Sequence, residues 1–429
     1  MTTLIQGGRI VDPANRVDKV GDVFIDDAGR IARAPQKRSG AATGADRVID
    51  ARGTVVAPGF VDIHAHLREP GEEWKEDIET GTRAAVAGGM TAVCCMANTR
   101  PVNDSRGVTE LILARAKEVG HCRVYPIGAV TKGLIGESLA EMGDLKRAGC
   151  VAVSDDGQPI MSAAVMRAAL EYARGLDLVV IAHEEDRTLA RGVMDEGPLS
   201  TALGMRGNPG AAEEVMVVRD IALAELAGPG ARLHIAHIST AAALRAVRAA
   251  RARGVVRVTC EVTPHHFSLT SESVRGYDSN FKMAPPLRGD SDRDAVVLAL
   301  RDGTIDAIAT DHAPHSLVEK EVEFDQAANG IVGFETALPL TLALVRQKTI
   351  SMGRAIRLLS KGPCDVIGLP GGTLTPGAPG DVVVFDPNEK WTVSASSLCS
   401  KSGNSPWMGA TMTGRVRATL VGGKVVYEA

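Results

Sequence analysis

The sequence predicts an α/β fold, a (β/α)8 barrel that carries a small β-domain built from both ends of the chain. The middle of the 429-residue chain alternates eight continuous apolar runs with Ala-, Leu- and Arg-rich stretches of helical spacing, several of which end in Gly. Both ends instead carry short β-like segments with Gly and Pro turns. Continuous apolar strands that alternate with helices are typical of a parallel sheet buried on both faces.

Each of the expected barrel strands is an apolar run bounded by turn residues. They cover residues 59–66, 91–98, 123–130, 150–156, 178–185, 232–239, 256–266 and 305–312. A doubly wound open sheet is the alternative arrangement, but it needs a glycine-rich turn after its first strand. The stretch "LREPG" that follows residue 66 has no GxGxxG pattern, which favours the closed barrel.

The two ends of the chain predict a second, smaller unit. The first 55 residues contain "VGDVFIDDAGRIAR", and the tail contains "GDVVVFDPN" and "RVRATLVGGKVVYEA". Neither end is long enough to build a comfortable core alone. We therefore predict one composite β-domain from residues 1–55 and 370–429, with the barrel over residues 56–369 inserted between them.

Composition narrows the classes of function. The formal net charge is -4 and no basic block occurs, so no nucleic-acid partner is expected. No apolar run approaches the ~20 residues of a membrane helix, and no secretory signal is visible, so no membrane association is expected. The seven cysteines are scattered and form no CxxC pair, which indicates reduced thiols in a cytoplasmic protein.

Most of the ten histidines fall at the ends of the expected strands. Active sites of such barrels lie at the C-terminal ends of the strands. His64 and His66 are two residues apart, so their side chains project to the same side of a strand and can hold one divalent metal. The other histidines at this edge are His183, His237, His265, His266, His312 and His315.

Two carboxylates complete a donor set at the same edge. Asp156 ends the run 150–156, and Asp311 lies in the run 305–312. With His64, His66, His183 and His237 they provide enough ligands for two metal ions that share a bridging ligand. Two Zn²⁺ ions held in this way would generate a hydroxide nucleophile and polarise a carbonyl. We assign Asp311 the role of proton shuttle.

Neighbouring polar residues have simpler interpretations. Asp155 points away from Asp156 if the strand continues, so only one of the two can face the metals. Four histidines are expected to support the fold or the ligands rather than bind metal: His234, His265, His266 and His312. The sequence has no GxSxG elbow and no GxxxxGK[ST] loop, which counts against a serine hydrolase and a phosphate-loop enzyme.

The ordered motifs resemble those of the class I bacterial dihydroorotases of the amidohydrolase superfamily. The similarity covers nearly the whole chain, and the motifs are "PGFVDIHAHLREPG", "MANTRPVND", "SDDG", "AHEED", "HIST", "EVTPHH" and "IATDHAPH". The resemblance implies a barrel with a composite β-domain, and reversible, zinc-dependent cyclisation of N-carbamoyl-L-aspartate to L-dihydroorotate in pyrimidine synthesis. It also implies a homo-oligomer, and leaves open a complex with aspartate carbamoyltransferase.

The resemblance also implies residue roles. The metal ligands would be His64, His66, Asp156, His183, His237 and Asp311, with Asp156 as the bridge and Asp311 as the general acid/base. The substrate contacts would be His66, Arg68, Asn98, His315, Asn329 and Gly330. An arginine two residues beyond the HxH pair can grip a carboxylate with two hydrogen bonds. One departure is Ala284, where the family commonly has Asn, and this leaves room for another cyclic ureide such as allantoin.

Two alternatives compete with this interpretation. Allantoinases and hydantoinases commonly bridge their metals with a carboxylated lysine after the fourth strand, where this chain has residues 154–157, "SDDG". The nearest lysines, Lys132 and Lys146, fall elsewhere, which counts against those enzymes. A non-catalytic, dihydroorotase-like scaffold for aspartate carbamoyltransferase would lack metal-site residues, and here every expected ligand is present.

Overall fold

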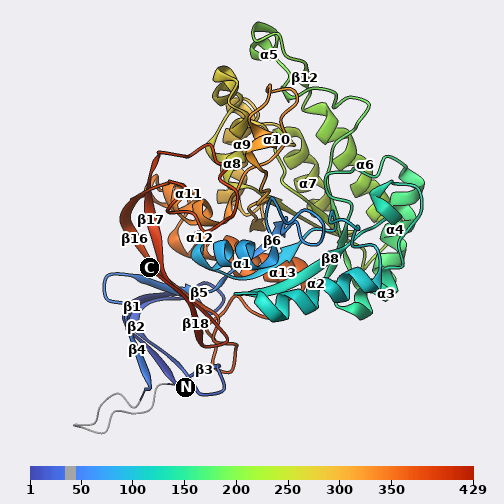
Figure 1. The fold of residues 1–429 in the computed structure, drawn as a ribbon. Helices are drawn as coiled ribbons and strands as arrows, with labels where there is room; N and C mark the ends of the chain where they lie inside the picture. The colour runs from blue at the N-terminus through green and yellow to red at the C-terminus, as the bar shows by residue number, and fades with distance from the viewer. Residues whose placement is uncertain (34–44) are drawn as a thin grey trace, which may run out of the picture.

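The computed structural model describes residues 1–33 and 45–429, and it contains a barrel of eight parallel strands surrounded by helices (Figure 1). The barrel strands follow one another around the sheet in chain order. Their bounds are β6 (Phe60–Ala65), β7 (Met90–Cys95), β8 (Arg123–Gly128), β9 (Ala152–Ser154), β10 (Val179–Ala182), β13 (Arg232–Ile235), β14 (Arg257–Val262) and β15 (Ala307–Ile308). Each overlaps one of the predicted runs, and the predicted (β/α)8 fold class is confirmed.

The strands are shorter than the apolar runs, and the polar residues at the ends of those runs lie just beyond the ladder. One prediction here was wrong. His265 and His266 do not end a strand; they lie in the short helix α8 (Pro264–Ser268). The Thr263 side chain caps this helix by accepting from the His266 N–H, and Pro264 occupies the first turn, where a missing N–H costs nothing.

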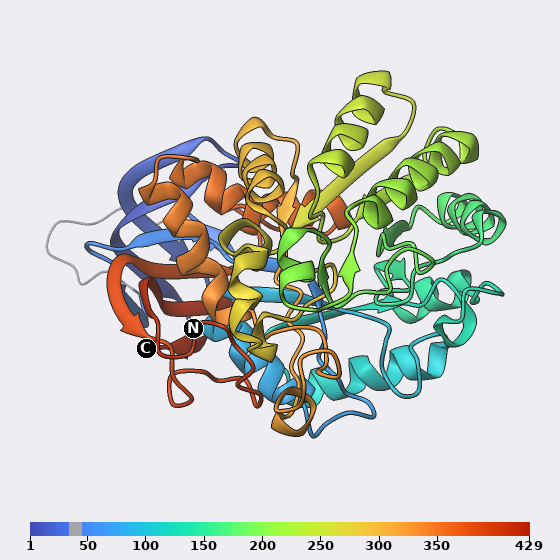
Figure 2. The same ribbon diagram turned by 90° about the horizontal axis from the view of Figure 1, so that it is seen from above.

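Helices cover the outside of the barrel, and Figure 2 shows them around it with the N-terminal strands gathered to one side. The larger helices are α1 (Ile78–Ala87), α2 (Arg106–Val119), α3 (Met142–Ala148), α4 (Ala163–Gly175), α6 (Ala211–Ala227), α7 (Ala241–Arg253), α9 (Asp290–Asp302), α11 (Phe334–Arg346), α12 (Met352–Leu359) and α13 (Lys361–Ile367). Short elements are η1 (Lys132–Leu134), α5 (Pro198–Ala202), η2 (Ser271–Gly276), η3 (Ser279–Phe281), α10 (Leu317–Lys320) and a β11 (Met194–Asp195)–β12 (Gly207–Asn208) pair. In the described residues, no helix is long and apolar enough to cross a membrane.

The barrel closes between its first and last strands at the end where the polar residues gather. The His66 N–H donates to His312 O at 2.9 Å, and the Asp311 N–H donates to His64 O at 3.0 Å. Below them, the buried Asp62 carboxylate accepts from the backbone N–H groups of His64 at 3.0 Å and Thr310 at 3.2 Å. The Asp62 side chain thus accepts hydrogen bonds that a neighbouring strand would otherwise accept, because β15 is too short to pair fully with β6.

A second sheet joins the two ends of the chain, in the order β18-β17-β16-β5-β1-β2-β3, with β4 paired to β1. Its strands are β1 (Thr3–Asp12), β2 (Val17–Ile25), β3 (Ile31–Ala32), β4 (Arg47–Asp50), β5 (Val55–Pro58), β16 (Val382–Thr392), β17 (Thr411–Val421) and β18 (Lys424–Glu428). The antiparallel pairing of β5 with β16 makes the connection, and Figure 1 shows the blue and red strands together. The division at residues 55 and 370 stays a prediction.

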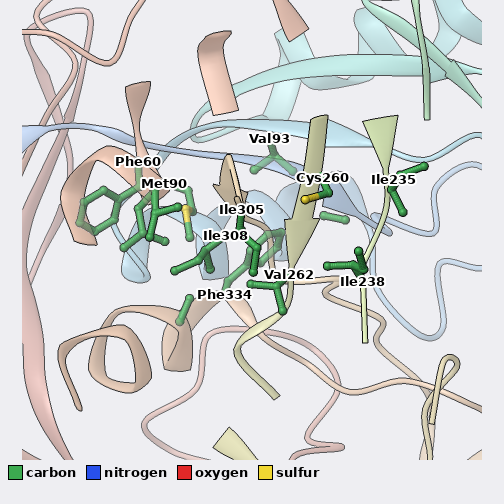
Figure 3. Packing of buried hydrophobic residues seen from close by; sticks show 14 of the residues in the cluster. Phe60, Met90, Val93, Ile235, Ile238, Cys260, Val262, Ile305, Ile308 and Phe334 are labelled. Atoms are coloured by element: carbon green, nitrogen blue, oxygen red, sulfur yellow. The ribbon is translucent and has the colours of Figure 1, made fainter. Parts of the chain in front are cut away.

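The main hydrophobic core lies between the barrel strands and the helices. Figure 3 shows Cys260 and Val262 of β14, Ile308 of β15 and Phe334 of α11 within one cluster. All four are almost fully buried. Fully burying such a side chain contributes about 1.5–3 kcal/mol, so this packing gives the strand ends a rigid support. Polar residues at the ends of the strands are therefore held in fixed positions relative to one another.

Candidate active site

A cavity of about 220 Å³ lies beyond the C-terminal ends of the barrel strands. All but one of the predicted site residues line it: His66, Arg68, Asn98, Asp156, His183, His237, Asp311, His315, Asn329 and Gly330. The exception, His64, is fully buried at the end of β6. The predicted residues therefore come together from separate strands, as expected for the active face of a barrel.

Asp156 lies at the centre of the imidazoles. Its Oδ1 is 3.3 Å from His64 Nε2, 3.5 Å from His237 Nε2 and 3.6 Å from His183 Nδ1. Its Oδ2 is 3.5 Å from His66 Nε2. Two groups of potential metal ligands result, one with His64 and His66 and one with His183 and His237, and Asp156 belongs to both. This is the position that a bridging carboxylate needs.

The protonation of the imidazoles fits a metal. His64 Nδ1 lies 2.7 Å from Glu261 Oε1, and because an ionised carboxylate only accepts, this nitrogen carries the proton. When His64 is neutral, as a metal ligand must be, its Nε2 lone pair faces Asp156 Oδ1, and neither buried atom has a hydrogen-bond partner. His66 likewise donates from Nδ1 to Asn98 Oδ1 at 3.0 Å. Facing, unpartnered acceptors in a nitrogen and oxygen donor set suit a divalent metal cofactor.

The pKa shifts of the clustered residues also support a metal site. Burial disfavours protonation of His64, but the Asp156 and Asp311 carboxylates outweigh it and raise the pKa of His64 well above its usual value. Burial would raise the pKa of Asp156, yet the surrounding imidazoles hold it well below its usual range. The cluster therefore attracts positive charge, and protons and a metal ion compete for the same atoms.

Two carboxylates that the sequence reasoning missed support the imidazoles from behind. Glu261 on β14 bonds His64, and its Oε2 lies 3.2 Å from His234 Nε2. Glu185 Oε2 is 3.7 Å from His183 Nε2, and Glu185 Oε1 accepts from Asn208 Nδ2 at 2.7 Å. Burial would raise the pKa of Glu185, but the nearby His183 imidazole lowers it to about 2. Carboxylates in these positions fix the orientation of metal-binding histidines.

Asp311 stands beside both histidines of the HxH pair. Its Oδ1 is 3.0 Å from His66 Nε2 and 3.6 Å from His64 Nε2. Its φ is +48°, and Arg68 and His237 also have positive φ, at +62° and +30°. Residues other than glycine rarely adopt this conformation, which costs of order 1–3 kcal/mol each and concentrates at functional sites. The fold holds these three side chains in place against that cost.

The other end of the cavity offers positive charge and hydrogen-bond donors. The buried Arg68 donates from Nε to Pro314 O at 3.1 Å, and its Nη2 lies 3.3 Å from His315 Nε2. His315 Nε2 lies 2.8 Å from Asn329 O, and since a carbonyl only accepts, Nε2 carries the proton. The N–H of Gly330 donates to Lys282 O at 2.9 Å. Ala284 also lines the cavity, so the departure from the family's Asn falls at the site.

The neighbouring Asp155 faces elsewhere. Its carboxylate accepts from the backbone N–H groups of Val130 at 2.8 Å and Thr131 at 3.0 Å. Lys132 and Lys146 are both exposed, and neither lines the cavity. In the described residues, the place between the imidazoles is therefore taken by an aspartate rather than by a lysine.

His315 gives a pH-dependent contribution to stability that can be isolated. Burial and the nearby Arg68 guanidinium lower the pKa of His315 to about 3. An unfolded chain protonates this histidine below about pH 6.5. His315 therefore reduces the free energy of unfolding as the pH falls from about 6.5 toward about 3. Burial raises the pKa of Asp62 to about 7 and of Asp155 to about 6, and these groups contribute the opposite slope.

Asp62, Asp155 and the other titrating groups are present in both the wild-type protein and His315→Asn. Their contributions to the pH dependence of stability therefore cancel when the two proteins are compared. Between about pH 7 and about pH 5, the wild-type protein should lose on the order of 2 kcal/mol more unfolding free energy than the variant. Urea denaturation of both proteins at the two pH values, with chelator present, measures the difference. Equal losses in the two proteins would contradict a depressed pKa for His315.

Comparisons with known proteins agree with this geometry. The Dihydro-orotase-like family model matches residues 53–243, and the Amidohydrolase family model matches residues 208–427. A dihydroorotase from Anaeromyxobacter dehalogenans is 56% identical over 99% of this chain and 97% of its own. One from Geobacter metallireducens is 51% identical over 100% of both chains.

Solved structures of hydantoinases share the fold. An L-hydantoinase from Arthrobacter aurescens has a TM-score of 0.87 and 24% identity, and the match covers 99% of this chain and 96% of that one. At this identity the likeness shows the fold alone. The full-length relatives carry the assignment: the chain belongs to the dihydroorotase family of the amidohydrolases.

Proposed function

We propose that the protein is a zinc-dependent dihydroorotase that interconverts N-carbamoyl-L-aspartate and L-dihydroorotate. The observation that carries the proposal is Asp156, shared between two groups of metal ligands, with Arg68 and His315 in the same cavity. The first feature suits hydrolysis of an amide, and the second suits a substrate that bears a carboxylate. Full-length relatives named dihydroorotase support the substrate class.

We assign two Zn²⁺ ions per subunit. His64 and His66 would hold one, His183 and His237 the other, with Asp156 between them and Asp311 beside the first. When bound, the metal lowers the pKa of a water molecule and polarises the scissile carbonyl. The family relationship and the His and Asp donor groups support a metal cofactor; zinc and the number of ions are our proposals.

The protein residues orient the substrate and move the proton. Arg68, Asn98 and His315 are assigned to the substrate carboxylate and its neighbouring polar groups, with His66, Asn329 and Gly330 beside them. In the hydrolytic direction, Asp311 accepts a proton as water adds to the ring carbonyl carbon. It delivers that proton to the ring nitrogen as the carbon–nitrogen bond breaks. In the cyclising direction Asp311 removes the proton from the ureido nitrogen.

Metal analysis and substrate turnover test the proposed function. The purified protein should contain zinc and hydrolyse dihydroorotate, and dialysis against a chelator should abolish turnover. Zinc should restore it, because the donor atoms are held by the fold rather than by the metal alone. Turnover of allantoin or hydantoin in preference to dihydroorotate would overturn the substrate assignment, and full activity without metal would overturn the metal role.

The proposed activity also implies a pathway, a compartment and an assembly state. We assign the enzyme to pyrimidine synthesis in the cytoplasm, as a homo-oligomer. All seven cysteines are free thiols, which fits a reducing compartment. Association with aspartate carbamoyltransferase stays a prediction, and size-exclusion chromatography of the two proteins alone and mixed would measure both the oligomeric state and the complex.

A further inference from the structure

A C-terminal segment, residues 400–404, lies against the loops that form the substrate end of the cavity. Lys401 Nζ donates to Glu73 O at 2.8 Å, and Ser402 Oγ donates to Lys75 O at 2.7 Å. These bonds attach the segment to the chain that follows Arg68. At its other end the segment reaches the loops that carry His315 and Gly330. A part of the chain remote in sequence thus spans both sides of the substrate end.

Asn404 makes the contacts at that end with both groups of its amide. Its Oδ1 accepts from the His315 N–H at 3.1 Å. Its Nδ2 donates to Ala313 O at 3.0 Å and to Gly330 O at 3.1 Å. The side chain is buried, with 5% of the residue exposed. Burial without these bonds would be costly for an amide and for the carbonyls it satisfies.

The groups that Asn404 holds determine the shape of the cavity. His315 and Gly330 line it, and the His315 side chain in turn bonds Asn329 O. Gly330 has a φ of +115°, and a Cβ there would lie 2.5 Å from Ala313 Cβ. The Ala313 side chain therefore lies so close to the Cα of residue 330 that only glycine fits there, and the Asn404 amide bridges the carbonyl groups of Ala313 and Gly330.

We propose that Asn404 is a positioning residue, which sets the substrate end of the cavity by holding His315 and Gly330 at a fixed separation. The inference rests on the proposed function for its substrate. Asn404 does not line the cavity, and none of its hydrogen bonds reaches a candidate metal ligand. It acts on substrate binding and leaves the proton transfer and the metal site alone.

Replacement of Asn404 should therefore separate binding from chemistry. For Asn404→Ala we expect the KM for dihydroorotate to rise about 10-fold or more while kcat stays within about threefold, the pattern of lost uniform binding. Asn404→Asp keeps an acceptor for the His315 N–H but loses both donors, so its KM should also rise. The zinc content of both variants should match the wild-type protein.

Ser402→Ala is the matched control. Ser402 is buried in the same segment, and its Oγ bonds Lys75 O without touching His315 or Gly330. It should lose comparable thermal stability while its KM stays within twofold of wild type. A KM for Asn404→Ala within twofold of wild type, or a KM rise of the same size in Ser402→Ala, would overturn the proposal. If Asn404→Ala does not fold, Asn404→Asp is judged by the same limits.

Amide hydrogen exchange keeps this test independent of the reaction. Loss of the Asn404 Oδ1 acceptor should speed exchange of the His315 amide in Asn404→Ala, and Asn404→Asp should retain its protection. Peptides that contain His64 and His183 should exchange as in wild type. A wild-type protein that does not turn over dihydroorotate would overturn the proposed function, while unchanged exchange at His315 in Asn404→Ala would overturn the positioning role.

Discussion

Asp311→Asn is expected to lower kcat for dihydroorotate by about 10²–10⁴-fold, the usual contribution of a positioned general acid/base. The substitution keeps the size of the side chain and an oxygen that can face His66 Nε2, 3.0 Å away in the wild-type protein. It removes the group that accepts and returns the proton. Burial would raise the pKa of Asp311, but the charge of the nearby imidazoles lowers it, so the carboxylate is ionised and ready to accept.

The measurement is steady-state turnover of dihydroorotate with metal analysis of the same protein. Zinc content should fall less than on loss of His64 and His66, because Asp156 and the four imidazoles form both ligand groups without Asp311. Asp186→Asn is the matched control. Asp186 lies just beyond Glu185 and bonds Thr188, so its variant should turn over as wild type does. Near-normal turnover in Asp311→Asn would remove Asp311 from the chemistry.

The barrel and the positions of its polar residues could be predicted because both depend on local sequence. Apolar runs that alternate with helical stretches have few alternatives to a parallel barrel. In such a barrel every strand ends at the same rim. Residues as far apart in sequence as His64 and Asp311 could therefore be expected to meet, and the structure places them 3.6 Å apart.

The supporting carboxylates could not be chosen in the same way. A carboxylate within an apolar run has the same sequence signal whether it bonds a histidine or the backbone. Glu261 bonds His64, but Asp62 and Asp155, in equivalent settings, accept from backbone N–H groups. Only the three-dimensional register decides between these outcomes. Asn404 has still less signal, because it lies in an irregular segment that tertiary packing alone brings to the cavity.

His265 and His266 were predicted to end a strand, but the residues just before them indicate the start of a helix. Thr263 followed by Pro264 is a typical helix start, since threonine caps the N-terminus and proline suits the first turn. From residue 256 to residue 262 every second residue is apolar, so the period favoured a strand, and the prediction extended that strand through the polar residues that follow. Capping residues therefore correct strand ends that apolar character extends too far.

Glu261→Gln is expected to weaken metal binding at the His64 side by about 10–100-fold, the usual effect of removing a partner of a metal-binding histidine. Glu261 is buried between His64 Nδ1, 2.7 Å away, and His234 Nε2, 3.2 Å away. Burial would raise the pKa of Glu261, but the two histidines lower it to about 2, so the native group is a carboxylate. Glutamine keeps the shape and loses the charge that makes His64 a stronger ligand.

Competition titration with a chromophoric chelator measures the zinc affinity of this variant, and Glu76→Gln separates the specific effect from the cost of losing any buried carboxylate. Glu76 is also fully buried and pairs with a histidine, His312, at 3.4 Å, but that histidine belongs to neither group of metal ligands. Both variants should lose stability, and only Glu261→Gln should lose zinc affinity. Equal affinities in the two variants would mean that His64 is oriented by packing alone, and that its bond to Glu261 serves the fold rather than the metal.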